Sequence, residues 1–134
     1  MPTTKSPVVW IVDDDKDDQY LFELAFTTLT PPVEVKLLND GEEFLLTLSQ
    51  SDVLPNLVVL DVNMPRLNGF DTLKRLRAEP AYKNLPVVIL TTSSRPQDHD
   101  KAMQLGANGF LTKVGATGNL LMLLTQLVPS WRLS

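Results

Sequence analysis

Carboxylate, hydroxyl and ammonium side chains stand directly after four apolar runs of this sequence. The first run is followed by Asp13–Asp15, the third by Asp61, the fourth by Thr91 and a weaker fifth run by Lys113. If the runs are strands of one parallel sheet, these side chains meet at its carboxyl edge, where such sheets bind ligands. An acid at the end of a buried strand costs free energy unless a partner compensates its charge. The sequence therefore predicts one polar site in which cationic groups face several carboxylates.

The clustered acids are suited to binding a hard divalent cation. Carboxylates that lie close together repel one another, and one of them tends to stay protonated unless a cation is present. Mg²⁺ takes one or two carboxylate ligands and keeps water and phosphate oxygens in its other positions. We expect Asp14 and Asp61 to bind Mg²⁺ directly and Asp13 to bind it through water. The backbone carbonyl of Asn63 could fill a further position.

The same groups are suited to receiving a phosphoryl group. A metal ion and a lysine neutralise charge on the transferring group, and positioning supplies most of the remaining catalysis. Lys113 could reach a phosphate oxygen with its mobile ammonium, and Thr91 could donate a hydrogen bond to one. Asp61 would then be the nucleophile and would carry an aspartyl phosphate. This chemistry explains why a buried strand ends on an acid, since a rigid strand aims the carboxylate.

The apolar runs themselves are predicted strands. The first, third and fourth are almost continuously apolar and rich in Val and Ile, which is typical of strands buried on both faces of a parallel sheet. The predicted strands are Val8–Val12, Val33–Leu38, Leu57–Leu60, Val87–Leu90 and the weaker Gly109–Thr112.

A helical pattern follows each predicted strand. The patterns span Gln19–Leu29, about Asp40–Gln50, Phe70–Glu79, about Pro96–Gly106 and about Thr117–Val128. Asp40, with Glu43 three residues later, resembles a capping box. Five β-α alternations predict an α/β fold, a doubly wound three-layer sandwich with a parallel sheet and right-handed crossovers. We expect one domain over residues 1–134 and no output domain.

Composition and charge exclude several classes of protein. The chain has 134 residues, the size of one domain, and a formal net charge of −4 without a Lys/Arg cluster, so direct binding to nucleic acid is not expected. It has no cysteine, which excludes disulfides and thiolate metal sites and fits a reducing compartment. No apolar run approaches the ~18 residues of a membrane helix, and the first residues do not form a signal peptide. We therefore expect a cytoplasmic protein that does not enter a membrane.

Four stretches, in order, resemble the receiver domain of two-component response regulators, of the single-domain type seen in the chemotaxis regulator. They are "WIVDDDKDD", "LVVLDVNMPRLNGFDTLKRLR", "PVVILTTSS" and "GANGFLTK", and the resemblance extends from Val8 to about Val128. It implies a flavodoxin-like, or CheY-like, five-stranded parallel sheet of order 2-1-3-4-5. It also implies Mg²⁺-dependent phosphorylation of Asp61 by the phosphohistidine of a sensor histidine kinase or phosphotransfer protein. Such a protein is a signalling module and not an enzyme, since it catalyses only its own phosphorylation and dephosphorylation.

The resemblance also implies a role for each residue of the predicted site. Asp13 and Asp14 are the acidic pair, Asp61 is the phosphoacceptor, Asn63 supplies the metal-binding carbonyl, Thr91 is the switch hydroxyl and Lys113 contacts the phosphate. Phe110 stands where the family has its switch aromatic. Phosphate on Asp61 would draw Thr91 inward, and Phe110 would rotate into the vacated space. The surface of the fourth helix, fifth strand and fifth helix would then change for a downstream partner, or for a second copy in a homodimer.

Val114 departs from the family pattern, which usually has a proline after the lysine. A cis bond at a non-proline residue costs about 2.5–4 kcal/mol, so the loop would have to place Lys113 differently. This departure leaves a pseudo-receiver open, a phosphorylation-independent protein-interaction module on the same fold. A hydrolase of the haloacid dehalogenase type is disfavoured because Asn63 stands where that family has a second acid. A flavin or nucleotide binder is disfavoured because no glycine-rich phosphate-binding motif follows the first strand.

Two other features have a structural and a functional interpretation. The last predicted helix contains "NLLMLLTQLV", which is apolar over more than the ~100° stripe of a core-facing helix. This surface could contact a second copy or another protein, or the tail with Trp131 could cover it. His99 lies in a polar helical pattern without metal-ligand neighbours, which predicts a solvated position on the surface.

Overall fold

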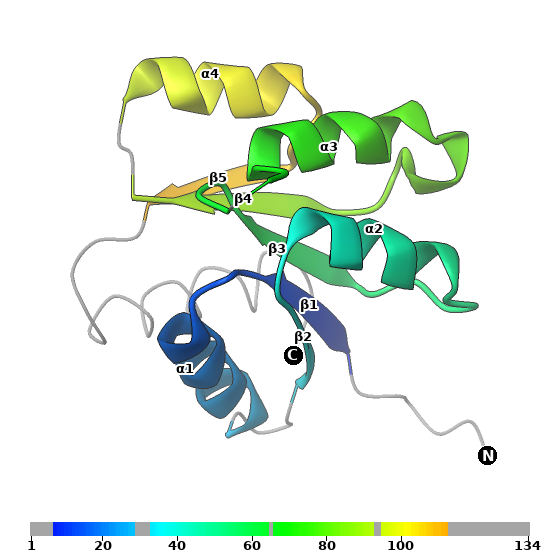
Figure 1. The fold of residues 1–134 in the computed structure, drawn as a ribbon, viewed down its shortest axis with the longest axis vertical. Helices are drawn as coiled ribbons and strands as arrows, with labels where there is room; N and C mark the ends of the chain where they lie inside the picture. Colours follow the sequence, from blue (N-terminus) through cyan, green and yellow to red (C-terminus); the bar gives the residue numbers. More distant parts are fainter. Residues whose placement is uncertain (1–6, 29–32, 65, 93–94, 113–134) are drawn as a thin grey trace.

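The structure, a computed structural model, describes residues 7–28, 33–64, 66–92 and 95–112 (Figure 1). Five strands and four α-helices alternate over these residues, with one short 3-10 helix before β4. The strands are β1 (Val8–Val12), β2 (Glu34–Leu38), β3 (Leu57–Asp61), β4 (Val87–Thr91) and β5 (Gly109–Thr112). The helices are α1 (Lys16–Thr27), α2 (Gly41–Ser49), α3 (Gly69–Ala78), η1 (Pro80–Tyr82) and α4 (Pro96–Gln104). The predicted helix at 117–128, Trp131, Lys113 and Val114 lie outside the described residues.

All five strands pair in parallel to form one sheet with the order β2-β1-β3-β4-β5. The order confirms the flavodoxin-like topology that the resemblance implies. In Figure 1, α1 lies on one side of the sheet, and α2, α3 and α4 lie on the other. The three central strands β1, β3 and β4 are buried almost throughout, and their side chains contribute to core clusters on both faces of the sheet.

The hydrophobic core has two parts, one on each face of the sheet. The part under α2, α3 and α4 contains Trp10 and Phe44, whose rings meet edge to face with centroids 6.2 Å apart. The part under α1 contains Phe22 and Phe26, whose stacked rings have centroids 6.4 Å apart. Alternate residues of β1 supply the two parts, since successive side chains of a strand point to opposite faces. This packing makes the central strands a rigid base for side chains at their ends.

The start of α1 differs from the prediction, because the helix begins at Lys16 and not at Gln19. The side chain of Asp15 accepts hydrogen bonds from the backbone N–H groups of Asp17 and Asp18 at 2.9 and 3.1 Å. These are two of the donors that a helix start leaves without partners, so Asp15 caps the helix. The apolar pattern does not show this turn, since its residues are polar and face the solvent or the site.

The predicted capping box of α2 is present, except that Glu43 bonds back to Asn39 and not to Asp40. The carboxylate of Asp40 accepts a hydrogen bond from the backbone N–H of Glu43 at 2.7 Å. The carboxylate of Glu43 reaches back to the backbone N–H of Asn39 at 3.0 Å, one residue before the cap. Asp40 also forms an ion pair of 3.2 Å with Arg66, whose φ of 66° lies in the left-handed region.

The turn between α4 and β5 is held by the guanidinium of Arg77 on α3. This group donates to the backbone carbonyls of Tyr82 and Gly106 and to the side-chain oxygen of Asn108, at 2.7 to 3.0 Å. Burial lowers the pKa of Arg77 from its ordinary value. Gly106 has a φ of 98°, which a residue with a Cβ adopts only with strain.

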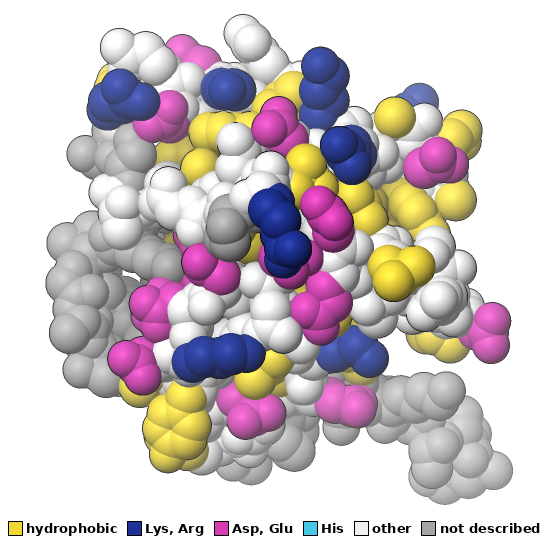
Figure 2. Space-filling model, in the orientation of Figure 1, with side chains coloured by type: hydrophobic (Ala, Val, Ile, Leu, Met, Phe, Trp, Pro, Cys, Tyr) yellow, Lys and Arg dark blue, Asp and Glu magenta, His cyan; other side chains and the backbone are white. Residues whose placement is uncertain are grey.

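The molecular surface has features that bear on two further predictions. On the face shown in Figure 2, Lys and Arg side chains lie among acidic, hydrophobic and other side chains, and the expectation of no direct nucleic-acid binding stays a prediction. β2 is an edge strand of the sheet, and it exposes Glu34 and Lys36. Among the described residues, no helix is long and apolar enough to cross a membrane.

Candidate functional site

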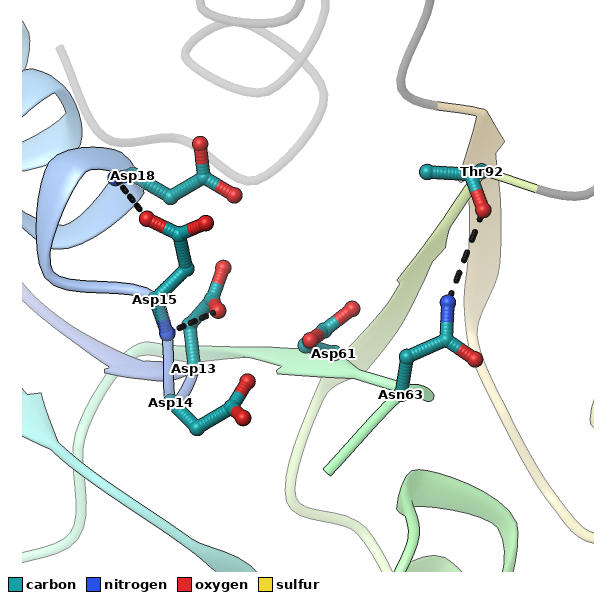
Figure 3. A pocket seen from close by; sticks show the side chains of 7 residues that line it. All are labelled: Asp13, Asp14, Asp15, Asp18, Asp61, Asn63 and Thr92. Carbon is teal, nitrogen blue, oxygen red and sulfur yellow. Dashed lines mark hydrogen bonds between the residues drawn. The ribbon is translucent and has the colours of Figure 1, made fainter. Parts of the chain in front are cut away.

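A pocket of ≈ 380 Å³ opens at the carboxyl edge of the sheet. Its lining comes from the ends of β1, β3 and β4 and from the first turn of α1 (Figure 3). The lining residues are Asp13, Asp14, Asp15, Asp18, Asp61, Asn63 and Thr92. Five of these seven residues are acids, so the pocket is suited to cations and repels free anions unless a cation is bound.

The three consecutive aspartates after β1 have three different environments. Asp13 is buried, and its carboxylate accepts a hydrogen bond from the backbone N–H of Asp15 at 3.0 Å. Asp14 is exposed, and its carboxylate points into the pocket on the side of Asp61 (Figure 3). Asp15 caps α1, so its carboxylate is already engaged with backbone N–H groups. Of the three, Asp13 and Asp14 face Asp61 most directly.

Asp61 is the last residue of β3, and only 4% of it is exposed. The first residue of α3 packs directly against its backbone. A Cβ placed on Gly69 would lie 2.5 Å from the carbonyl oxygen of Asp61 and 2.8 Å from the Cα of Val62. Only glycine allows this approach, because real Cβ atoms do not come so close to backbone atoms. The strand and the helix start together fix the direction of the Asp61 carboxylate.

Asp13, Asp14 and Asp61 fit a small divalent cation. One carboxylate oxygen from each residue can be chosen so that all three lie within 4.8 Å of one another. Oxygens that share one Mg²⁺ at about 2.1 Å lie up to about 4.2 Å apart, so this group requires little adjustment or one bridging water. The donors are all oxygen atoms, which is the ligand type that Mg²⁺, Ca²⁺ and Mn²⁺ prefer.

Asn63 and two threonines lie on the other side of Asp61. Thr91 ends β4 and is buried, and Thr92 follows it at the rim of the pocket. The side-chain amide of Asn63 donates to the hydroxyl of Thr92 at 3.5 Å, which joins the loops after β3 and β4 (Figure 3). Both side chains line the pocket, so they present polar groups on this side of Asp61.

The prediction of a solvated surface position for His99 is confirmed, and its ring also contacts a neighbouring strand. Its ring packs edge to face on Phe110 with centroids 5.3 Å apart, and 54% of the side chain is exposed. Phe110 on β5 is half-buried and packs against the core under α4. The pattern for α4 does not reveal this contact, because it depends on how α4 lies across β5. Lys113, the predicted phosphate contact, falls outside the described residues.

Two residues near the site were not predicted. Asp18 lies half-buried in the pocket wall, three residues after the cap Asp15, so helical spacing places both on one side of the turn. Gln19 is buried behind the acids and donates to the backbone carbonyl of Asp13 at 2.6 Å. No signal in the sequence identifies it, since polar residues are ordinary in an amphipathic helix.

A sheet of this order, with an acidic pair after β1 and a buried aspartate at the end of β3, defines a receiver domain of the chemotaxis-regulator type. The family model described as response regulator receiver domain matches residues 9–125. The chain therefore belongs to the response regulator receiver family of two-component signalling.

Individual relatives agree with this assignment. The chain is 31% identical over 129 residues to the response regulator Rcp1 of Synechocystis sp., covering 92% of this chain and 88% of Rcp1. The crystal structure of a phosphorylated cyanobacterial phytochrome response regulator, RcpA, matches with a TM-score of 0.88 and 28% identity over 96% of this chain and 95% of RcpA. The Mn²⁺-bound form of Rcp1 matches with a TM-score of 0.83 and 31% identity over 93% of this chain and 94% of Rcp1.

Proposed function

We propose that this receiver domain accepts a phosphoryl group on Asp61 from the phosphohistidine of a sensor histidine kinase or phosphotransfer protein, with Mg²⁺ as its cofactor. The observation that supports this proposal most strongly is the group of three carboxylates within 4.8 Å around a buried strand end. The relatives add support, since one is described as phosphorylated and another as Mn²⁺-bound.

The chemistry is an in-line transfer onto a carboxylate. An oxygen of Asp61 forms a bond to phosphorus while the phosphorus–nitrogen bond of the donor breaks, and the imidazole nitrogen leaves with the electron pair. The strand and Gly69 hold Asp61 in place during this step. Asp13, Asp14 and Asp61 would hold Mg²⁺, which would offset the negative charge on the phosphoryl oxygens. Lys113 contacts a phosphate oxygen in this proposal.

Loss of the phosphoryl group completes the cycle. Water attacks phosphorus, the bond to Asp61 breaks, and inorganic phosphate leaves. Asn63 and Thr92 stand at the rim through which this water enters. The chain catalyses only its own phosphorylation and dephosphorylation, so it is a signalling protein without turnover of a separate substrate. Because its phosphoryl donor is a kinase that uses cytoplasmic ATP, we place the protein in the cytoplasm.

The signal leaves through the face that carries α4 and β5. Phosphate on Asp61 attracts the hydroxyl of the buried Thr91, and the half-buried ring of Phe110 moves into the space that Thr91 leaves. Phe110 is linked to α4 through His99, so its movement changes the surface of α4. A downstream protein, or a second copy of the chain, binds the changed surface.

Chemical phosphorylation tests the proposal directly. We expect the protein with Mg²⁺ and acetyl phosphate to gain one phosphoryl group, which peptide mapping locates at Asp61. Asp61→Asn should abolish the adduct, while Asp52→Asn, a change at an exposed loop acid, should leave it intact. EDTA should prevent labelling. An adduct that persists in Asp61→Asn would show that the assignment is wrong.

A pseudo-receiver is the second candidate, and Val114 favours it because the family usually has proline after the lysine. In that case the protein binds its partner through α4 and β5 without modification. The same experiment separates the two functions, since a pseudo-receiver gains no phosphoryl group although it folds normally. Circular dichroism of the unlabelled sample would verify that the fold is intact.

A further inference from the structure

Gln19 is a buried polar residue of α1 that the proposed chemistry does not use. Only 4% of it is exposed, although glutamine is seldom so deeply buried. Its side-chain nitrogen lies 2.6 Å from the carbonyl of Asp13, 3.0 Å from the side-chain oxygen of Asn39 and 3.4 Å from the carbonyl of Leu38. One amide group therefore joins α1 to the ends of both β1 and β2.

The surrounding charges fix the orientation of this amide. The carboxylate of Glu43 can only accept, so it takes the side-chain N–H of Asn39 at 3.1 Å. The side-chain oxygen of Asn39 then faces Lys16 and Gln19, and the ammonium of Lys16 donates to it. Because three acceptors surround its side-chain nitrogen, Gln19 must direct its NH₂ group toward the backbone carbonyl of Asp13.

The hydrogen bond to Asp13 acts on the peptide unit that connects the two acids of the pair. The carbonyl of Asp13 belongs to the peptide bond between Asp13 and Asp14, and the backbone N–H of Asp13 donates to Leu38 at 3.0 Å. Both sides of Asp13 are thus tied to neighbouring elements. Rotation of this peptide unit would turn the exposed Asp14 carboxylate away from Asp61, because the backbone dihedrals set the direction of the side chain.

We infer that Gln19 is a positioning residue for the cation site, which aims Asp13 and Asp14 at Asp61 without touching the cation. This inference rests on the proposed function, since it assumes that the three acids bind a divalent cation. Groups that orient metal ligands typically contribute about ten- to a hundredfold to metal affinity. Since Gln19 acts through the backbone of the ligands, we expect an effect of about tenfold, at the lower end of that range.

Calorimetric titration with Mg²⁺ and with Mn²⁺ tests the inference on the unphosphorylated protein. Gln19→Met keeps the length of the side chain and removes its donors, and Gln97→Met is the matched change at an exposed position of α4. We expect Kd for both cations to rise about tenfold in Gln19→Met and to stay unchanged in Gln97→Met. Urea unfolding in EDTA measures the stability of each variant separately.

The outcomes distinguish the inference from the proposed function. If the wild-type protein binds neither cation, the proposed cation site fails and the inference fails with it. If the wild type binds and folded Gln19→Met binds equally well, only the inference is overturned, and Gln19 has a role in stability alone. If Gln19→Met does not fold, Asn39→Ala decides the question, because it removes the acceptor that helps to orient the amide. A several-fold rise in Kd in Asn39→Ala supports the inference, and an unchanged Kd overturns it.

Discussion

Gly69→Ala is expected to damage the site through the backbone of Asp61. The added Cβ would lie 2.5 Å from the carbonyl oxygen of Asp61, whereas ordinary contact begins at 3.4 Å. The helix start and the strand end must therefore separate by about 0.9 Å, the difference between these distances. Overpacking of this kind costs about 1–3 kcal/mol, of which the lower flexibility of alanine in the unfolded chain recovers up to about 1 kcal/mol. Because a contact of 2.5 Å is far shorter than an ordinary one, the upper part of this range applies, about 2–3 kcal/mol, which leaves a net loss of about 1–2 kcal/mol in the free energy of unfolding.

The same displacement should slow phosphorylation by a larger factor than the stability loss suggests. A shift of about 1 Å in a reacting group can cost about a hundredfold in rate, so we expect Gly69→Ala to accept phosphate at least tenfold more slowly than the wild type. The assay is the initial rate of Asp61 labelling by acetyl phosphate with saturating Mg²⁺, alongside urea unfolding.

Gly106→Ala provides the control for this experiment. Its φ of 98° and its contact with the Arg77 side chain at 3.1 Å predict a comparable loss of stability, about 1–2 kcal/mol. The turn before β5 lies outside the pocket lining, so folded Gly106→Ala should label at the wild-type rate. If Gly69→Ala keeps both the wild-type stability and the wild-type rate, the contact between Gly69 and Asp61 does not position the nucleophile.

Three further substitutions test the local structure, each by urea unfolding. Arg77→Lys should lower the free energy of unfolding by about 2–3 kcal/mol, because a lysine cannot span the three acceptors that the guanidinium reaches. A loss below about 0.5 kcal/mol would contradict this. Asp40→Ala should lower the free energy of unfolding by about 1 kcal/mol, because it removes the N-cap of α2. A control change at the exposed Asp52 should leave the free energy of unfolding almost unchanged. Arg66→Gly should be more stable than Arg66→Ala by roughly 1 kcal/mol, since only glycine adopts a φ of 66° without strain; equal stabilities would refute this.

The strands and their order could be predicted because two independent signals agreed. Continuous apolar runs located β1, β3 and β4, and the quoted motifs supplied the order of the sheet. The position of the acids at the carboxyl edge followed from the parallel arrangement, since a strand must end where its apolar run ends. The shared pocket of Asp13, Asp14 and Asp61 is thus a consequence of topology. Their chemical roles stay predictions until the labelling experiment is done.

The remaining features depend on contacts that a linear pattern does not contain. The helix α1 begins three residues before the start that the apolar pattern predicts, because the capping turn consists of polar residues without apolar periodicity. The contact between His99 and Phe110 depends on the crossing of α4 over β5. Gln19 looked like one more polar helix residue, and only the fold shows that three acceptors surround its nitrogen. In each case tertiary structure, and not local preference, decides the role.

The two exposed charges on β2 also affect how the protein behaves at high concentration. A strand at the end of a sheet offers unpaired backbone groups to another chain and can start intermolecular sheet growth. Glu34 and Lys36 place charge on this strand, and Lys36 lies over the ring of Trp10 at 5.6 Å. Replacing both by threonine or valine would preserve the strand and remove this protection against aggregation.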